Sequence, residues 1–126
     1  MPTDDFVARF VGYANEIPVQ IVGDGACIEA DGSVLTTPHV SLTGAATAFI
    51  HASAVVLEPA ISNGPNRLPC TVADAAFMGD HVEYVLRREA GMQLKARAPI
   101  GTPIFARGTK VAAYLPVDKL IVVPRT

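Results

Sequence analysis

Short runs of apolar and β-branched residues, each closed by a turn sequence, follow one another along most of the chain. Runs of about four to eight such residues between glycine, proline or aspartate clusters are typical of β-strands joined by tight turns. In the first half, Gly23-Asp24-Gly25 and Asp31-Gly32 are turns of this kind. The pattern predicts strands at 17–22, 26–30, 34–37, 46–52, 55–57, 70–77, 82–88, 92–98, 104–106, 111–115 and 120–123.

The start of the chain has a different spacing. Residues 2–5, PTDD, supply a helix cap and N-terminal acids, and the apolar residues of 6–11 then share one helical face before Gly12. This spacing predicts a short amphipathic helix.

The segment 59–69, PAISNGPNRLP, interrupts the strands. Its prolines and its Asn63-Gly64 turn exclude a helix and a central strand, so it is expected to connect two halves. We therefore divide the chain into a helix at 1–12, a first half at 13–59, a connector at 60–69 and a second half at 70–126.

The two halves close in a similar way. Residues 44–59 parallel residues 108–124, since each segment has a β-prone run after a glycine and a second apolar run before a proline. Either an internal duplication explains this similarity, or it arises because strands joined by turns have similar residue patterns in any protein. The architecture that we expect is all-β, with two small, partly open OB-like barrels packed together.

The apolar pattern predicts the pairing register of the hairpin around residues 89–91, Glu-Ala-Gly. A two-residue turn would set Leu86 opposite Lys95. A three-residue loop with Gly91 in the left-handed conformation sets Leu86 opposite Leu94 instead, which makes one face continuously apolar. The sequence predicts the three-residue loop, with Tyr84 opposite Ala96 and Val82 opposite Ala98.

The same register gives the hairpin a charged outer face. It sets Glu83 against Arg97, an opposite-charge pair worth about 0.2–1 kcal/mol, and Val85 beside the stem of Lys95. A solvated surface is the simpler interpretation of these charges. The alternative is a contact surface for a partner or an effector, made of Asp80, Glu83, Lys95 and Arg97.

Composition narrows the class of protein. Half of the 126 residues are apolar and 17% are charged, which excludes a disordered tail and favours a surface covered by a partner. The formal net charge of −2 leaves no basic stripe for nucleic acid. No apolar run approaches the ~20 residues of a membrane helix, and Cys27 and Cys70 lack metal or redox spacing, so both are interpreted as reduced core residues of a cytoplasmic protein.

Residues with chemical potential do not form a recognisable centre. His39, His51 and His81 lack metal-ligand spacing, and the aspartates, Asp4, Asp5, Asp24, Asp31 and Asp80, occupy capping or turn positions. No Gly-x-x-x-x-Gly-Lys-Ser/Thr loop is present, so the chain by itself is not expected to bind ATP. We assign no catalytic residue, no cofactor site and no metal site.

The order of these features resembles a known family. Residues 2–15, PTDDFVARFVGYAN, have the form Pro-x-x-x-Phe-Val-Ala-x-Phe-x-Gly-x-x-Asn. This phrase is similar to the one that follows the nucleotide-binding domain in ATPases of polyamine, ferric iron and sulfate importers, where the transport-associated OB domain, TOBE, begins. The second half is similar too, in FMGD at 77–80, GMQL at 91–94, GTKV at 108–111 and LIVV at 120–123. His51-Ala52-Ser53 departs from the Arg-Pro-Glu that the family usually has there, which leaves the solute and any role of that triplet open.

The resemblance implies a C-terminal regulatory domain that holds two ATPase subunits together as a homodimer, next to the ATPase domain of the same parent chain and at the inner face of the cell membrane. A regulatory protein or a small effector is a further expected partner. Such a domain is not an enzyme in itself. The main alternative is a free-standing module that captures a small oxyanion. An OB-type nucleic-acid binder would need stacking aromatics in a basic groove, which this sequence does not offer.

Overall fold

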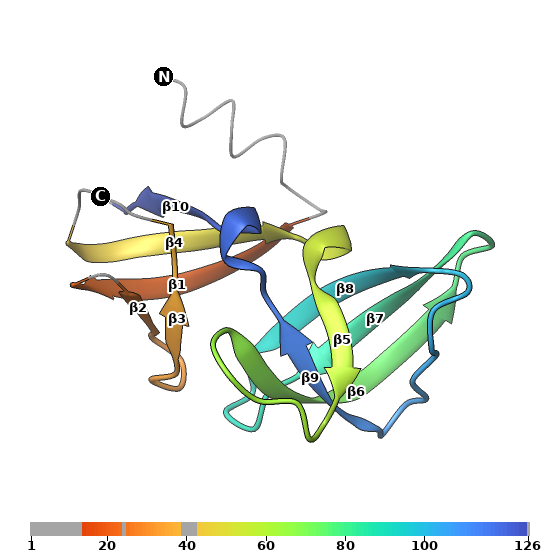
Figure 1. Cartoon of the computed structure of the whole chain (residues 1–126). Coiled ribbons are helices and arrows are strands. Elements are labelled where there is room, and N and C mark those ends of the chain that lie inside the picture. The colour runs from red at the N-terminus through yellow and green to blue at the C-terminus, as the bar shows by residue number, and fades with distance from the viewer. Residues whose placement is uncertain (1–13, 24, 39–42, 126) are drawn as a thin grey trace.

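The computed structural model describes residues 14–23, 25–38 and 43–125, which form two antiparallel five-stranded sheets (Figure 1). The predicted helix at 1–12 lies outside these residues. The first sheet contains β1 (Ala14–Val22), β2 (Gly25–Ile28), β3 (Val34–Thr36), β4 (Gly44–His51) and β10 (Ile121–Pro124). The second sheet contains β5 (Val56–Pro59), β6 (Arg67–Phe77), β7 (His81–Arg87), β8 (Gln93–Pro99) and β9 (Lys110–Tyr114). The nearly all-β fold agrees with the prediction.

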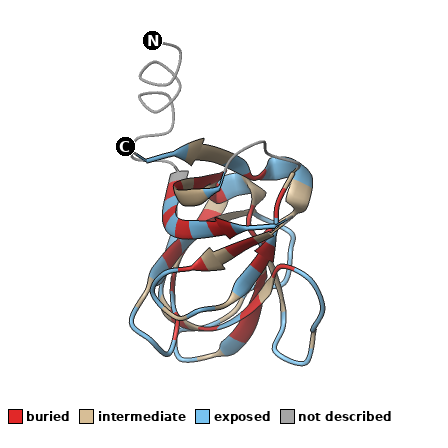
Figure 2. Cartoon of the chain, turned by 90° about the vertical axis from the view of Figure 1, so that its left-hand side faces the viewer, coloured by how far each residue is buried: buried red, intermediate tan, exposed pale blue. Residues whose placement is uncertain are grey.

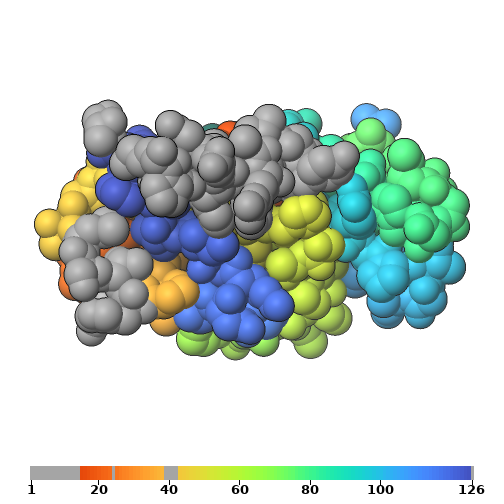
Figure 3. Space-filling model, turned by 90° about the horizontal axis from the view of Figure 1, so that it is seen from above, coloured from red at the N-terminus to blue at the C-terminus, as the bar shows by residue number. Residues whose placement is uncertain are grey.

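The two sheets exchange their closing strands. After β4, the 3₁₀ turn η1 (Ala52–Ala54) leads the chain into β5, which pairs with β9 of the second sheet. After β9, the turn η2 (Val117–Lys119) leads it back into β10, which pairs with β4 of the first sheet. Figure 3 shows this C-terminal segment in blue, on the surface between the two halves. The sheets are therefore intertwined.

The exchange is reciprocal in register. The strand orders, β10-β4-β1-β2-β3 and β5-β9-β6-β7-β8, correspond strand by strand. Val56 lies opposite Tyr114, and Ile121 lies opposite Phe49 in the same way. The parallel between residues 44–59 and 108–124 is thus a structural repeat, whereas the domain boundaries 13–59 and 70–126 remain a prediction.

One strand prediction in the second half is wrong. Residues 104–106 form no strand, because Gly101 and Pro103 follow β8 and interrupt the ladder there. Strand β6 begins at Arg67, three residues before the predicted start of this strand at Cys70. Pro69 is tolerated within the sheet because β7 pairs with β6 only from Thr71 onward, so the N–H that proline lacks would have no ladder partner on that side. On the same side, the carbonyl oxygen of Pro69 accepts a hydrogen bond of 3.0 Å from Arg88 Nη1.

The hairpin between β7 and β8 has the predicted register. Leu86 lies opposite Leu94 and Glu83 lies opposite Arg97. Gly91 has φ +94°, and its N–H donates to Arg88 O at 2.9 Å, as a three-residue loop with a glycine bulge requires. Alternation of apolar and polar residues was sufficient here because a one-residue slip would have turned Lys95 into the core.

A single hydrophobic core joins the inner faces of both sheets (Figure 2). Ile17 and Ile50 of the first sheet and Tyr84 and Leu86 of the second are among its fully buried side chains. Cys70 is buried and free, as predicted. Cys27 is also free but only half-buried, so its assignment to the core is wrong: it lies on the outer face of β2, between the inward-facing Ala26 and Ile28.

Candidate functional site

The four candidate contact residues lie on and beside the hairpin of β7 and β8. Arg97 Nη2 donates to Glu83 Oε2 at 3.2 Å, so the predicted cross-strand ion pair is formed. Asp80 lies in the turn before β7, and Lys95 is exposed on β8 opposite Val85. The structure thus joins Glu83 to Arg97, and no ion pair of the described residues includes Lys95.

His81 links Asp80 to this pair. Its Nδ1 is 2.6 Å from Asp80 Oδ1, and its Nε2 is 3.4 Å from Glu83 Oε2. The hydrogen bond with His81 holds the pKa of the Asp80 carboxyl below its usual value. Asp80, His81, Glu83 and Arg97 therefore form one chain of polar contacts. Their role as partner or effector contacts stays a prediction.

Two buried asparagines connect the sheets at equivalent positions. Asn15 of β1 accepts a hydrogen bond from Lys95 N at 2.6 Å and donates to Lys95 O at 2.9 Å. Asn66, directly before β6, makes the same pair of bonds with the backbone of Thr36, at 2.7 and 2.8 Å, and a third with Leu115 O at 2.9 Å. Each asparagine thereby pairs with the edge strand of the other sheet, β8 or β3, which holds the two sheets in one arrangement.

Arg88 crosses between the sheets at a different point. Its Nε donates to Asp31 Oδ2 at 2.9 Å, its Nη2 to Ser33 Oγ at 2.7 Å and its Nη1 to Pro69 O at 3.0 Å. Asp31 also accepts a hydrogen bond from Ser33 N, as its turn position predicts. The side chains of Arg88 and Asp31 are only 10% and 12% exposed, so this is a largely buried ion pair with its polar groups satisfied.

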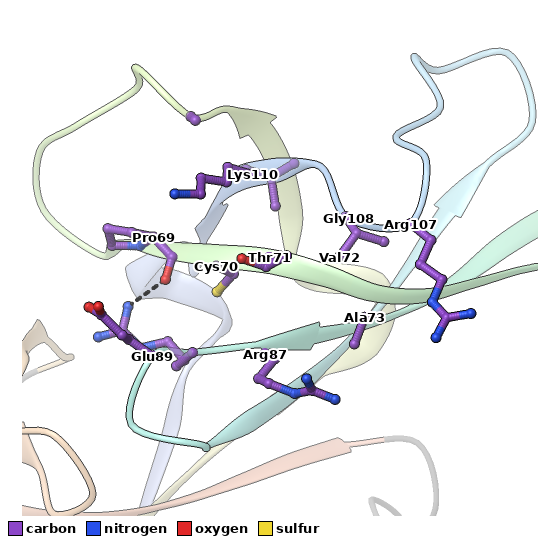
Figure 4. Close-up of a pocket in the computed structure, with 13 residues that line it drawn as sticks. Pro69, Cys70, Thr71, Val72, Ala73, Arg87, Glu89, Arg107, Gly108 and Lys110 are labelled. Atoms are coloured by element: carbon purple, nitrogen blue, oxygen red, sulfur yellow. Dashed lines mark hydrogen bonds between the residues drawn. The ribbon is translucent and has the colours of Figure 1, made fainter.

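A pocket of about 670 Å³ opens on the outer face of the second sheet, where β6, β7 and β9 meet (Figure 4). Figure 4 shows Arg87 and Arg107 on either side of Ala73, with Lys110 and Glu89 toward the other end. Its charged lining residues are Arg87, Arg88, Glu89, Arg107 and Lys110. Hereafter we call it the cationic pocket.

The cysteine that lines the cationic pocket is not an activated nucleophile. Cys70 contributes to the lining, but burial raises the pKa of the Cys70 thiol to about 11, so the thiol is protonated at neutral pH. His51 is occupied in capping η1, where its Nδ1 accepts from Ser53 N at 3.2 Å. In the part of the chain that the structure describes, no three histidine, cysteine, aspartate or glutamate side chains are placed to hold a metal ion.

The asparagines and the Arg88–Asp31 pair were missed in the sequence. One signal for the asparagines exists, since Asn15-Glu16-Ile17-Pro18 and Asn66-Arg67-Leu68-Pro69 share the form Asn-x-apolar-Pro. No comparable signal exists for Arg88 and Asp31, because they are 57 residues apart in unrelated turns.

The family follows from a comparison with known proteins. Residues 39–123, about two thirds of the chain, match the model of the TOBE domain. The chain belongs to the TOBE domain family. The opening phrase at 2–15 lies outside the matched residues, so the similarity of the second half is the part of the predicted resemblance that this match confirms.

Curated relatives of this TOBE domain are ATP-binding proteins. It is 33% identical over 94 residues to the Fe(3+) ions import ATP-binding protein FbpC of Brucella abortus and 33% identical over 88 residues to the protein of that name from Streptomyces avermitilis. The alignments cover 71% and 70% of this chain but 26% and 24% of the relatives. The chain therefore spans about a quarter of the length of these ATP-binding proteins.

A solved structure shows the same fold as this TOBE domain. The cytoplasmic molybdate-binding protein ModG, with molybdate bound, superposes with a TM-score of 0.74 over 91% of this chain and 99% of that chain. The two sequences are 13% identical, so the likeness concerns the OB-type fold alone. Among the described residues of the domain, no helix is long and apolar enough to span a membrane.

Proposed function

We propose that this TOBE domain is the regulatory and dimerisation domain of the ATP-binding subunit of a solute importer. The similarity to a quarter of the Fe(3+) import ATP-binding proteins carries the proposal. The sequence contains no phosphate-binding loop, so the domain acts through contacts with the ATPase domain of its parent chain, at the cytoplasmic face of the membrane.

The intertwined sheets suit this role. β5 and β10 each pair with the sheet of the other half, and Asn15 and Asn66 form hydrogen bonds with the edge strand of the other sheet. One sheet therefore cannot move without disturbing the other. A domain of this kind behaves as one rigid body, and a rigid body transmits a contact made at one end to whatever is attached at the other.

The parent protein provides the test. A purification tag is inserted after Thr126 at the natural gene, and the tagged protein is isolated from its own cells, with the untagged strain as control. We expect a polypeptide several times longer than 126 residues that hydrolyses ATP. A tagged protein of only 126 residues that purifies without an ATPase would contradict the proposal.

The dimer surface that we propose is an apolar patch at one end of the second sheet. Phe77, Met78 and Ile100 are 49–65% exposed, and they make up three of the nine large apolar side chains that are exposed in the described part of the chain. The turn at 77–80 is held beside Ile100, whose N–H donates to Asp80 O at 3.3 Å. A second copy covers this patch in a twofold contact, since an isologous interface places the same surface on both sides.

This surface predicts the behaviour of the isolated domain. We expect light scattering at tens of micromolar to give twice the monomer mass of 13.2 kDa. Phe77→Asp places a charge in the contact and should weaken self-association by about 100-fold or more, leaving a monomer. Ile61→Asp is the matched control, because Ile61 is 90% exposed in the β5–β6 loop and should have no effect. A monomeric unsubstituted domain, or equal effects of both substitutions, would refute the patch.

A further inference from the structure

A row of three side chains crosses the outer face of the second sheet at the cationic pocket. Thr71 of β6 lies opposite Arg87 of β7 on one side and opposite Lys110 of β9 on the other. The residues next to them, such as Cys70 and Leu86, are buried, so the row faces outward. Neighbouring strands are about 4.8 Å apart, which places the Thr71 hydroxyl between two cationic side chains.

A β-bulge at Ala73 shapes the pocket beside this row. The ladder between β6 and β7 shifts register between Val72 and Asp74, which leaves Ala73 as the extra residue. A bulge bends its strand and increases the local twist. Ala73 has only a methyl group and Gly108 has no side chain, so neither residue fills the pocket. Arg107 extends toward the pocket from the loop before β9 (Figure 4).

The positive charge of the pocket is not neutralised by the domain itself. Within the described residues, Arg87, Arg107 and Lys110 make no ion pair, and Arg88 is neutralised by Asp31. The other arginines of this part of the chain do pair with acids: Arg67 with Glu58, Arg97 with Glu83 and Arg125 with Glu29. A protein with a formal net charge of −2 thus concentrates three unpaired cations at one pocket, with Glu89 as the single acid in its lining.

The repeat of the fold does not account for this arrangement. In the first sheet, Gln20 holds the position of Thr71, since it pairs with a strand on each side, with Cys27 and with Ala45. The equivalent row is therefore Cys27, Gln20 and Ala45, without any charge. The cations belong to the second sheet alone.

We propose that the cationic pocket binds a small organic polyanion, a molecule with at least two carboxylate or phosphate groups. Guanidinium groups bind the oxygens of such groups in pairs, and a lysine and a hydroxyl complete the set of donors. A volume of about 670 Å³ is within the usual range of small-molecule sites and exceeds what one tetrahedral ion fills. The site is a property of this domain, so it stands or falls independently of the parent ATPase.

Calorimetric titration of the isolated domain at low ionic strength, with citrate and with inorganic pyrophosphate as probes, tests the pocket. We expect saturable binding of at least one probe, weakened at high salt because exposed charges are screened. Arg87→Gln and Arg107→Gln should each weaken it by about tenfold, as the loss of one charge-assisted hydrogen bond implies. Thr71→Val should weaken it by about threefold, since a neutral hydrogen bond is lost.

Lys119→Gln is the matched control, because Lys119 is an exposed cation of η2 that makes no ion pair with the described residues and lies outside the pocket. It should leave the affinity unchanged. Amide shifts on adding the probe should centre on Thr71 and Gly108. Molybdate and sulfate should bind at least tenfold more weakly than the better probe. The proposal is overturned by absent binding of both probes, by equal losses in Lys119→Gln and Arg87→Gln, or by tighter binding of the tetrahedral ions.

Discussion

Asn66→Ala is expected to lower the free energy of unfolding by about 4 kcal/mol. The substitution removes three hydrogen-bond partners at once, from Thr36 N, Thr36 O and Leu115 O. Asn66 is only 3% exposed, so water cannot take over its hydrogen bonds. Each backbone group left unpaired costs about 1–3 kcal/mol. Asn66 also has φ +60°, a conformation that alanine adopts at a cost of about 1 kcal/mol.

Two variants separate these contributions in urea or thermal unfolding. Asn66→Gly keeps the left-handed backbone without strain and should be about 1 kcal/mol less destabilised than Asn66→Ala. Asn63→Ala changes an exposed asparagine in the same loop and should stay within about 0.5 kcal/mol of the unsubstituted domain. If Asn66→Ala were no worse than Asn63→Ala, the asparagine would not be the connection between the sheets that its bonds indicate.

Arg88→Met is expected to cost about 3 kcal/mol. It deletes the partner of Asp31, whose carboxylate is left largely buried, and it frees Ser33 Oγ and Pro69 O. Removing one member of a buried ion pair typically costs about 3–5 kcal/mol, because the remaining charge is uncompensated. Arg87→Met is the control, since the neighbouring Arg87 is exposed and should change stability by about 0.5 kcal/mol or less.

A second substitution tests the cause of that loss. In the Asp31→Asn/Arg88→Met variant no buried charge is left alone, so about 1–2 kcal/mol of the loss should be recovered. A double variant that is as unstable as the sum of the two single variants would show that the charges are not coupled.

Acid pH provides an independent check on the pair. Burial alone would raise the pKa of Asp31, but hydrogen bonds from Ser33 and Arg88 outweigh it and hold the pKa below its ordinary value of 3.8. A depressed folded pKa means that the contribution of Asp31 is present above its unfolded pKa and is lost as pH falls through the folded pKa. The difference in stability between the unsubstituted domain and Arg88→Met should therefore shrink toward about pH 3. An unchanged difference at that pH would argue against the pair.

Local features of this fold could be read from the sequence because local chemistry decides them. The register at Leu86 and Leu94 followed from alternation, since only one loop length keeps the apolar residues of both strands on one face. The charged pair Glu83–Arg97 followed from that register. The error at 104–106 has a local cause too: Ile104 and Phe105 are apolar, but prolines and a glycine around them prevent ladder pairing.

The candidate site was predicted only in part. The hairpin charges were found from the register, but the row of Arg87, Thr71 and Lys110 was not, because its three members come from strands that the sequence does not assign to one another. Arg107 joins them from a loop, whose path no periodicity describes.

The sequence by itself determined the class of fold, most of the strands, the similarity of its closing segments and the family to which the chain belongs. Only the tertiary structure decided that β5 and β10 change sheets, that Asn15 and Asn66 pin the edges, and that Arg88 reaches Asp31. The physical reason is the range of the interactions. Alternation and turn chemistry act between neighbours in the chain, whereas strand exchange and buried polar contacts depend on which distant segments share one core, and many sequences of strands satisfy the same local rules.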